Sequence, residues 1–296
     1  MDWDDLRIFL AVARAESLSG AGKTLRLDPA TIGRRIQRLE VALSARLFAK
    51  SPQGYTLTDE GAKLMEPALR AETALSAVAD ELGQAQSGLT GQIRLGAPDG
   101  CANYLLPAVL TQICTANPGL EVQIVALPRV FNLSRREADM AIAVSRPETG
   151  RLTVQKLSDY HLHLAASRTY LAGSPPITGR EDLQKHRIVG YIADMIFDKE
   201  LDYLREIGAT QPALASNSVP VQVNLLRAGA GVGMVHDFAL PSAPELIKIL
   251  PDEITLTRAF WLIRHADDGR VERLSRFADL LVQGFRAELA RLEALS

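Results

Sequence analysis

Cysteine is scarce in this chain, which has two cysteines among its 296 residues. The apolar pattern suggests that Cys101 and Cys114 share one helix, where a rise of about 1.5 Å per residue would hold them roughly 20 Å apart. A disulfide needs Cα atoms within about 7 Å of each other. We therefore expect no intramolecular redox switch, and we interpret both residues as buried or inert thiols.

Long hydrophobic runs are also missing. No stretch approaches the roughly 18 uninterrupted apolar residues of a membrane-spanning helix. The first residues, Met1–Leu6, are acidic, and they lack the basic start and the apolar run of a secretory signal. We therefore expect a cytoplasmic protein with no membrane contact.

Neither sign of charge is in excess, because 33 basic residues face 35 acidic ones and the formal net charge is −2. Any affinity for nucleic acid must then come from a local basic patch. The hydrophobic content of 47% and the charged content of 23% are those of a folded globular protein. At roughly 100 to 200 residues per domain, the length predicts two units, of similar or unequal size.

Motifs of catalysis and metal binding are absent from the sequence, which has no nucleophile elbow, no Walker loop and no zinc-binding helix. His161 and His163 alternate along one predicted strand, but without a nearby cysteine or third histidine we expect structural roles for them. The stretch Gly229–Val235 follows a helix and precedes a strand, the reverse of a dinucleotide-binding loop. It is interpreted as a helix C-cap and a closely packed strand. We predict no catalytic residue, no metal site and no cofactor.

What the sequence does contain is a helix with a basic face, from Asp28 to Leu43. Asp28 can accept hydrogen bonds from the first free amides, and Pro29 suits the first helical position. Four apolar residues fall within roughly 40° of one another on a helical wheel: Ile32, Ile36, Leu39 and Leu43. The other side carries Thr31, Arg34 and Arg38, with Arg35 on the flank and no acidic residue between them. A solvated charged face is the plain alternative, but the preceding segment favours DNA binding.

The segment before this helix predicts a helix-turn-helix. Apolar residues at helical spacing predict a first helix over residues 4–15. Ser19 is expected to cap a short helix over Gly20–Leu25, and Arg26–Asp28 is the tight connection to the basic helix. In a helix-turn-helix, the second helix lies in the major groove of DNA.

A β-hairpin wing is predicted after the basic helix. The stretch Arg46–Thr58 holds two short strand-like runs, and Pro52–Gly54 between them is a turn signal. Lys50 and Gln53 are placed at the tip of the wing. There they would contact phosphate groups beside the groove and fix the orientation of the protein.

The next helix is expected to be capped by Thr58, and its apolar residues follow a heptad spacing. The predicted dimerisation seam consists of Leu64, Ala68, Ala71, Leu75, Val78 and Leu82. Such a seam favours a second copy, which would match two half-sites on DNA, whereas a helix that lies on its own domain remains the alternative. Pro67 lies within the pattern and predicts a kink or a late helix start.

These residues together resemble the N-terminal winged helix-turn-helix of LysR-type transcriptional regulators. The resemblance is carried by Leu6, Arg7 and Phe9, by the Ala13–Leu18 connection and the Arg34–Leu43 run, and by Leu47-Phe48 and Leu57-Thr58 with Gly61. The chain departs from the family at Asp28-Pro29, where a Ser-Gln pair is common, and at Gly33, where a serine is common. Either the operator preference differs or the arginines carry more of the binding. The predicted DNA-binding residues are Asp28, Pro29, Ala30, Thr31, Gly33, Arg34, Arg35, Arg38, Lys50 and Gln53.

A flexible joint at Ser87–Gly91 marks the predicted domain boundary. Strands are expected at 93–97, 120–127, 140–144, 154–157, 161–166, 188–192 and 260–263, and helices at 102–116, near Glu181, at 201–207, at 221–228 and at 270–295. Alternating strands and helices predict a parallel sheet with ligands at the C-terminal ends of its strands. The last helix is expected to cover the first half of this region.

This second region resembles the effector-binding domain of the same family, through Leu106-Pro107, Asn117-Pro118, the Asp139–Ile142 strand and Ala228–Val232. The resemblance implies two α/β lobes with an effector site between them, often for small carboxylates or aromatic acids. Free helix amides after the first strand favour anions, but Asp99 would repel an acid, so a cationic or neutral ligand stays open. The predicted effector-binding residues are Asp99, Gly100, Cys101, Asn103, Arg129, Phe131, Ser145, Asn217, Ser218 and His236.

The expected fold is α/β, with an all-α winged helix-turn-helix over 1–60, a linker and dimerisation helix over 61–90, and a two-lobed effector domain like that of periplasmic binding proteins over 91–296. Lobe I would take 91–160 and 265–296, and lobe II 161–264. The predicted function is a transcriptional regulator that binds a pseudo-palindromic operator on double-stranded DNA under the control of a small molecule. We expect a homodimer that assembles into a homotetramer, with RNA polymerase as an open further partner. The alternative is a solute-binding or enzymatic domain with an accessory DNA-binding head.

Overall fold

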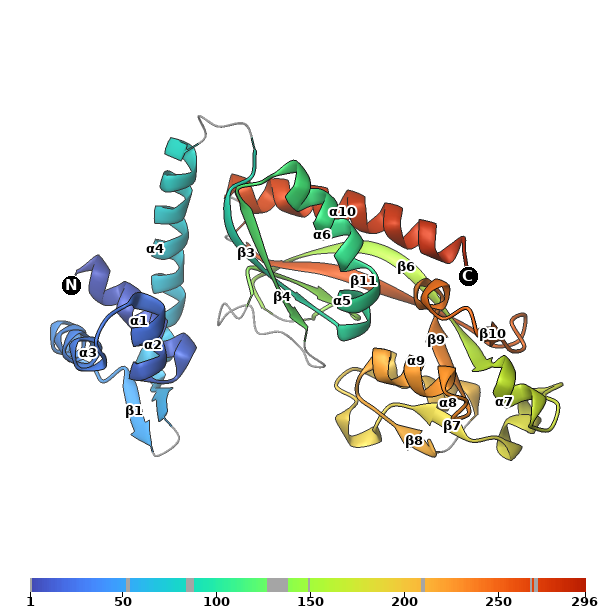
Figure 1. The fold of residues 1–296 in the computed structure, drawn as a ribbon. Coiled ribbons are helices and arrows are strands. Elements are labelled where there is room, and N and C mark those ends of the chain that lie inside the picture. The colour runs from blue at the N-terminus through green and yellow to red at the C-terminus, as the bar shows by residue number, and fades with distance from the viewer. Residues whose placement is uncertain are drawn as a thin grey trace. The chain divides into compact units, whose positions relative to one another are not determined.

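The computed structural model describes residues 2–296 except 52–53, 84–87, 127–137, 149, 209–210, 267 and 269–270, and it does not describe the side chains of 51, 73 and 76–83. The chain divides into two compact units, the first mainly Met1–Ser87 and the second most of the chain from Gly88 on (Figure 1). The finer limits at residues 60 and 90 remain predictions. None of the described helices is long and apolar enough to cross a membrane.

The first unit is a helix-turn-helix followed by a two-stranded wing and a long helix. Its elements are α1 (Trp3–Ala15), α2 (Leu18–Leu25), α3 (Pro29–Leu43), β1 (Phe48–Ser51), β2 (Gly54–Leu57) and α4 (Asp59–Gly83). α2 begins earlier than expected because Ser17, not Ser19, is its cap: the Ser17 hydroxyl accepts a hydrogen bond from the Gly20 amide at 3.0 Å.

The apolar faces of these helices meet in one core. Fully buried members include Ile8, Phe9, Leu10, Ile32 and Leu39. The inward stripe predicted for α3 is therefore confirmed, with Leu43 at its end only partly buried. The rings of Phe9 and Phe48 lie 5.4 Å apart, which joins α1 to the wing.

The wing is the predicted hairpin, since β1 and β2 pair antiparallel with Ser51 opposite Gly54. The expected turn residues 52–53 lie outside the described residues. The backbone of the wing is held against the first helix pair, because the Tyr55 amide donates to the Glu16 carbonyl at 2.8 Å. A Cβ at Gly54 would lie 2.5 Å from that carbonyl, and its φ of +136° also favours glycine.

The long helix α4 starts at Asp59 and has Pro67 inside it, so, of the kink or late start expected at Pro67, the late start is wrong. The Thr58 hydroxyl accepts a hydrogen bond from the Gly61 amide at 3.1 Å, and Asp59 and Glu60 lie in the first turn. This cap and the two carboxylates favour the early start.

The second unit is built on one mixed sheet. Its strands are β3 (Gly91–Ala97), β4 (Leu120–Ala126), β5 (Met140–Ala143), β6 (Leu152–Ser167), β7 (Ile188–Gly190), β8 (Leu214–Ala215), β9 (Val232–His236), β10 (Leu246–Lys248) and β11 (Thr255–His265). Its α-helices are α5 (Asp99–Tyr104), α6 (Leu106–Ala116), α7 (Arg168–Ala172), α8 (Tyr203–Ile207), α9 (Val219–Arg227) and α10 (Glu272–Glu293). Short 3₁₀ helices are η2 (Arg180–Lys185), η3 (Ala193–Met195), η4 (Lys199–Leu201) and η5 (Asp237–Ser242).

The sequence pattern predicted a parallel sheet, but the sheet is mixed. Its order is β4-β3-β5-β11-β6-β9-β7-β8, with β10 on β6. β3 pairs in parallel with β4 and β5, and β7 with β8 and β9, whereas β6 and β11 are antiparallel to each other and to their neighbours. The long pair β6–β11 thus joins two parallel groups of strands (Figure 1).

Two further expectations about this unit are wrong. The runs at 154–157 and 161–166 form the single strand β6. The helix expected over 102–116 divides at Leu105 into α5 and α6, because Pro107 removes a backbone donor and restricts the residue before it. Cys101 and Cys114 therefore lie on different helices, and both are free thiols.

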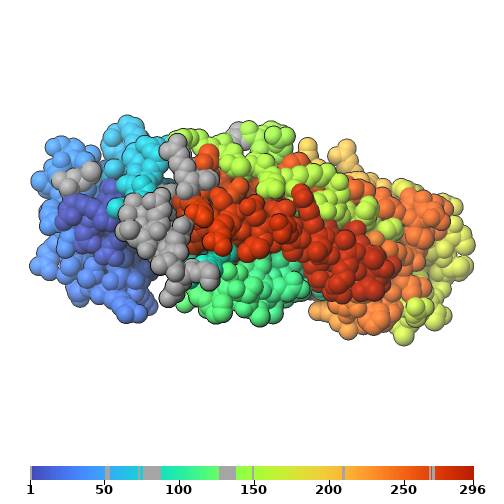
Figure 2. Space-filling view, turned by 90° about the horizontal axis from the view of Figure 1, so that it is seen from above, coloured from blue at the N-terminus to red at the C-terminus, as the bar shows by residue number. Residues whose placement is uncertain are grey.

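The C-terminal helix α10 packs on the side of the unit that holds α6. A Cβ at Gly284 would lie 2.8 Å from Val109 of α6, so glycine permits the close approach. Arg286 donates hydrogen bonds to the backbone carbonyls of Lys156 and Leu157 in β6. Figure 2 shows the red surface of α10 between the green surface around α6 and the lime surface around β6.

Candidate functional sites

The exposed N-terminal half of α3 is the first candidate site. The Asp28 carboxylate accepts a hydrogen bond from the Ala30 amide at 2.8 Å, and Pro29 occupies the first turn, as predicted. Arg34 is exposed and contacts the half-buried Thr31, donating from Nη2 to its hydroxyl at 3.2 Å. No carboxylate among the described residues pairs with Arg34, so its guanidinium group can meet a phosphate or a base edge.

The other two arginines of α3 are held by carboxylates at the start of α1, so the expectation of an unneutralised basic face is wrong. Arg38 donates to both oxygens of Asp5, at 2.7 and 2.5 Å. Arg35 lies 2.9 Å from Asp4 and 3.2 Å from Asp5. The acidic stretch at residues 2–5, which sequence reasoning used only against a secretory signal, was the missed sign of this cluster.

Asp5 is the central member of this cluster. Its side chain is only 3% exposed, so burial favours the neutral acid. Hydrogen bonds from Arg38 and Arg35 outweigh burial and lower the pKa of Asp5. Asp5 therefore stays ionised at neutral pH and fixes the orientation of both guanidinium groups.

The wing and α4 give mixed results for the remaining first-unit predictions. Lys50 is exposed, and its ammonium group lies 5.6 Å from the centre of the Tyr55 ring. Gln53 lies outside the described residues.

In the seam of α4, Ala68 is fully buried in the core of its own unit and is not available to a second copy, while Leu64 and Ala71 pack partly against that core. Leu75 is 48% exposed, and the side chains of Val78 and Leu82 are not described.

The second candidate site is a cavity in the second unit, with an empty volume of about 360 Å³ counted out to its open mouth. It lies where several strands end: β3 leads into Pro98–Cys101, β5 into Val144, β7 into Tyr191, and β9 ends at His236. The lining residues are Pro98, Asp99, Gly100, Cys101, Val144, Tyr160, Tyr191, Phe197, Leu201, Asn217, Val219, His236 and Phe260.

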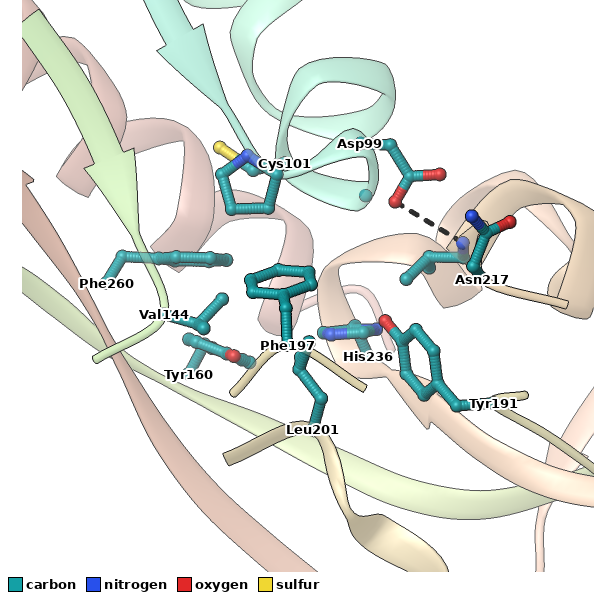
Figure 3. Close-up of a pocket in the computed structure, with 13 residues that line it drawn as sticks. Asp99, Cys101, Val144, Tyr160, Tyr191, Phe197, Leu201, Asn217, His236 and Phe260 are labelled. Carbon is teal, nitrogen blue, oxygen red and sulfur yellow. Dashed lines mark hydrogen bonds between the residues drawn. The ribbon is translucent and has the colours of Figure 1, made fainter. Parts of the chain in front are cut away.

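The walls of this cavity are mainly aromatic. Figure 3 shows Phe197 near the centre, with Tyr160 and Phe260 on one side and Tyr191 on the other. Tyr160 stacks on Phe260 at 4.2 Å and on His236 at 5.5 Å between ring centres. Tyr160 and Phe260 come from β6 and β11, beside the irregularity at Phe260/Trp261 where the register of the two strands shifts.

One buried polar atom of the lining residues, Nδ1 of His236, has no hydrogen-bond partner among the described residues. The other ring nitrogen of His236 lies 3.4 Å from the Tyr203 hydroxyl, which also interacts with the Tyr160 hydroxyl. Buried polar atoms are normally satisfied, so the unpaired nitrogen indicates a place for a ligand or water.

Burial also keeps the cavity nearly free of charge. It lowers the pKa of His236 to about 4, against a smaller opposite effect of Asp237. It raises the pKa of the Tyr160 hydroxyl and of the Cys101 thiol. At neutral pH these groups are uncharged, and Asp99 is the acidic residue among the described lining residues.

Asp99 bridges the two groups of strands. It is the first residue of α5, after β3, and its carboxylate accepts a hydrogen bond from the Val219 amide at the start of α9, at 3.4 Å. Figure 3 shows this bond beside Asn217. The amide that begins α9 is thus already bound to a carboxylate of the chain itself.

The structure brings together half of the predicted effector residues, namely Asp99, Gly100, Cys101, Asn217 and His236. Asn103 is exposed and donates to the Asp99 carbonyl, the Ser145 hydroxyl donates to Asp198, and Ser218 is outside the lining, so these three do not line the cavity. Arg129 and Phe131 lie outside the described residues. Sequence reasoning missed the aromatic wall; among its members, Tyr191 lies near the C-terminal end of the strand predicted over 188–192, the end where ligands were expected.

The paired histidines of β6 have ordinary structural partners. His163 lies 2.7 Å from Asp237 and 2.9 Å from the Thr255 hydroxyl, and His161 lies 3.1 Å from Glu293. Among the described residues, no group of three histidine, cysteine or acidic side chains could hold a metal ion.

Two family models match the chain. Residues 3–62 match the bacterial regulatory helix-turn-helix protein, lysR family, and residues 86–286 match the LysR substrate binding domain. The chain is 26% identical over 288 residues to the Mau operon transcriptional activator of Paracoccus denitrificans, covering 96% of this chain and 98% of that protein. It is 25% identical over 259 residues to the HTH-type transcriptional regulator PtxR of Pseudomonas aeruginosa, covering 85% and 82%.

Solved structures have the same fold. A full-length OxyR variant from Pseudomonas aeruginosa matches with a TM-score of 0.74 at 17% identity, covering 97% of this chain and 95% of that one. CrgA, a LysR-type transcriptional regulator from Neisseria meningitidis, matches with a TM-score of 0.57 at 22% identity, covering 96% and 99%.

Proposed function

This chain belongs to the LysR family of transcriptional regulators, and from that premise we propose which of its residues read DNA and which receive the effector. The expected family, fold class and general function are confirmed: the protein is a DNA-binding regulator modulated by an effector, and it is not an enzyme. The solute-binding and enzymatic alternatives are therefore set aside.

DNA reading is assigned to the first turns of α3, with Arg34 as the principal contact. This proposal rests on a contrast among the three arginines of α3. Arg34 pairs with no carboxylate among the described residues. Arg35 and Arg38 are bound by the carboxylates of Asp4 and Asp5. Asp28, Pro29, Ala30, Thr31 and Gly33 form the surface around Arg34, and Lys50 with Gln53 would contact the flanking phosphates. Arg35 and Arg38 orient α3 against α1 and contribute less to affinity.

Replacing Arg34 tests this assignment. Arg34→Ala is expected to weaken binding by roughly 10- to 100-fold, the range for one lost arginine–base contact. The duplex is selected with the wild-type protein from genomic fragments, and binding is followed by fluorescence anisotropy. Arg70→Ala, which removes an exposed arginine of α4, is the matched control and should bind normally. Equal binding by Arg34→Ala and wild type would contradict the assignment.

We place the protein in the cytoplasm as a homodimer on a pseudo-palindromic operator, with a homotetramer and contact with RNA polymerase as further steps. The exposed Leu75 supports pairing of α4 with a second copy, whereas the buried Ala68 does not. The five cavity residues Asp99, Gly100, Cys101, Asn217 and His236 are proposed as effector contacts, together with Tyr160 and Tyr191. An effector changes DNA binding only if it binds one arrangement of the protein more tightly than another.

A charge in the exposed part of the seam tests the dimer. Leu75→Asp is expected to convert the dimer to a monomer, because a carboxylate cannot be buried unpaired in an apolar interface. Light scattering measures the mass. Val41→Asp changes another exposed apolar residue of the same unit and should leave the mass unchanged. A Leu75→Asp dimer of wild-type stability would reject the seam.

A further inference from the structure

We propose that the cavity takes an uncharged aromatic molecule that hydrogen-bonds through a hydroxyl group, and that Asp99 excludes carboxylates from it. This inference rests on the proposed role of the cavity as the effector site and names the chemical class of its ligand.

The charges around the described part of the cavity oppose an acid. None of the described lining residues is a lysine or an arginine, and Asp99 is the acidic residue among them. Arg258 is close enough to act on the Tyr160 hydroxyl, but it does not line the cavity and is paired with Glu200 and Glu206. Among the described residues, a bound carboxylate would therefore face the Asp99 carboxylate with no lining cation to offset the repulsion.

The backbone amide best suited to an anion is also taken. Val219 begins α9, and its amide donates to the Asp99 carboxylate. An incoming carboxylate would have to displace a group of its own kind that is covalently part of the chain. Asp99 therefore links α5 to α9 through a hydrogen bond and repels anionic ligands.

The walls select an aromatic ring. Tyr160, Tyr191, Phe197 and Phe260 present ring faces and edges to the cavity (Figure 3). Rings pack against such walls in offset or edge-to-face contacts at centre distances of about 4.5 to 7 Å.

The unpaired nitrogen selects the hydroxyl. Nδ1 of His236 accepts or donates a hydrogen bond according to the tautomer. A ligand hydroxyl can serve this nitrogen in either tautomer, whereas a carboxylate can only accept.

Three probes of nearly equal size separate the classes: benzyl alcohol, benzoate and benzylamine. Binding to the full-length protein is measured by ligand NMR titration at pH 7. Benzyl alcohol is expected to bind at least about tenfold more tightly than benzoate, and more tightly than benzylamine. Tighter binding of benzoate or of benzylamine, or no binding of benzyl alcohol, would overturn the inference.

Asp99→Asn gives the sharpest comparison, because the amide oxygen can still accept from Val219. It is expected to strengthen benzoate binding by about tenfold or more, a larger gain than any it gives to benzyl alcohol binding. Asp252→Asn removes an exposed carboxylate outside the cavity and should change neither. Benzoate binding that does not improve in Asp99→Asn would overturn the role of the carboxylate.

A second variant keeps the test independent of Asp99. His236→Phe retains a ring but removes the unpaired nitrogen, and it should weaken benzyl alcohol binding several-fold; unchanged binding would reject the role of this nitrogen. Operator binding is measured on every variant. If benzyl alcohol does not bind while operator binding persists, the ligand class is wrong but the role as a DNA-binding regulator is unaffected. If benzyl alcohol binds as expected but never alters operator binding, the assignment of the cavity as the effector site is wrong.

Discussion

On α3 the ionised side chains lie at or near the surface and are arranged by other charges, whereas in the cavity burial keeps most titratable groups neutral. Arg38 is 54% exposed on its side chain and bonded to Asp5, but His236 is buried with its pKa lowered to about 4. The two regions meet different ligands. A polyanion is attracted by charges that remain solvated, while a small molecule in a mainly apolar cavity is recognised by shape and by few polar atoms.

This contrast teaches that the number of charged residues in a segment is a poor guide to what it binds. α3 has three arginines, yet two of them are engaged by the chain itself. The cavity has one carboxylate, yet that one decides which ligands are admitted. Partners within the fold, rather than composition, determine which charges are available.

The largest effect is expected at His236. Its pKa is lowered from 6.5 to about 4. Between pH 6.5 and pH 4, His236 is therefore protonated in the unfolded chain but neutral in the folded protein. Stability is therefore full above pH 6.5 and falls as the pH drops toward 4, by roughly 3 kcal/mol for this group. His236→Phe keeps the ring contacts with Tyr160 and Phe238 but removes the titrating group.

The free energy of unfolding is measured by chemical denaturation for wild type and for His236→Phe, at several pH values between 7 and 4. The free energy of unfolding of wild type should fall more steeply than that of His236→Phe over this interval. Parallel curves would show that His236 titrates as in the unfolded chain, and the contrast between a charged surface and a neutral cavity would be broken.

A smaller effect is expected at Asp5, because both of its arginine partners are partly solvated and screening weakens such pairs. The pKa of Asp5 is lowered, so its ion pairs stabilise the fold above the ordinary pKa near 4 and are lost as the pH falls through the lowered value. Asp5→Asn should lower the melting temperature by a few degrees at pH 7. The difference from wild type should shrink as the solution is made strongly acidic, and a constant difference would argue against ionisation as its cause.

Local structure was predictable where its cause is local. Asp28 and Pro29 mark the start of α3, Thr58 marks the start of α4, and the glycine-rich stretch forms the end of α9 and the strand β9 as expected. Each of these depends on residues within one turn of helix or one strand.

What depends on tertiary packing was not predictable. Asp5 and Arg38 are far apart in sequence and meet only because α1 crosses α3. The sequence pattern predicts two strands where the single strand β6 lies, because polar residues near Ser158 interrupt the alternation of apolar residues. At this point the pairing of β6 with β11 shifts register. Phe197 reaches the cavity from an irregular segment between 3₁₀ helices, which has no periodicity to detect.

Operator binding by Arg34→Ala and Arg38→Ala, measured side by side on one selected duplex, tests the division of labour on α3 most directly. The account predicts that Arg34→Ala binds roughly 10- to 100-fold more weakly than wild type and that Arg38→Ala, once its fold is verified, binds within about threefold of it. A loss of equal or greater size in Arg38→Ala would contradict the claim that Asp5 has already engaged that arginine.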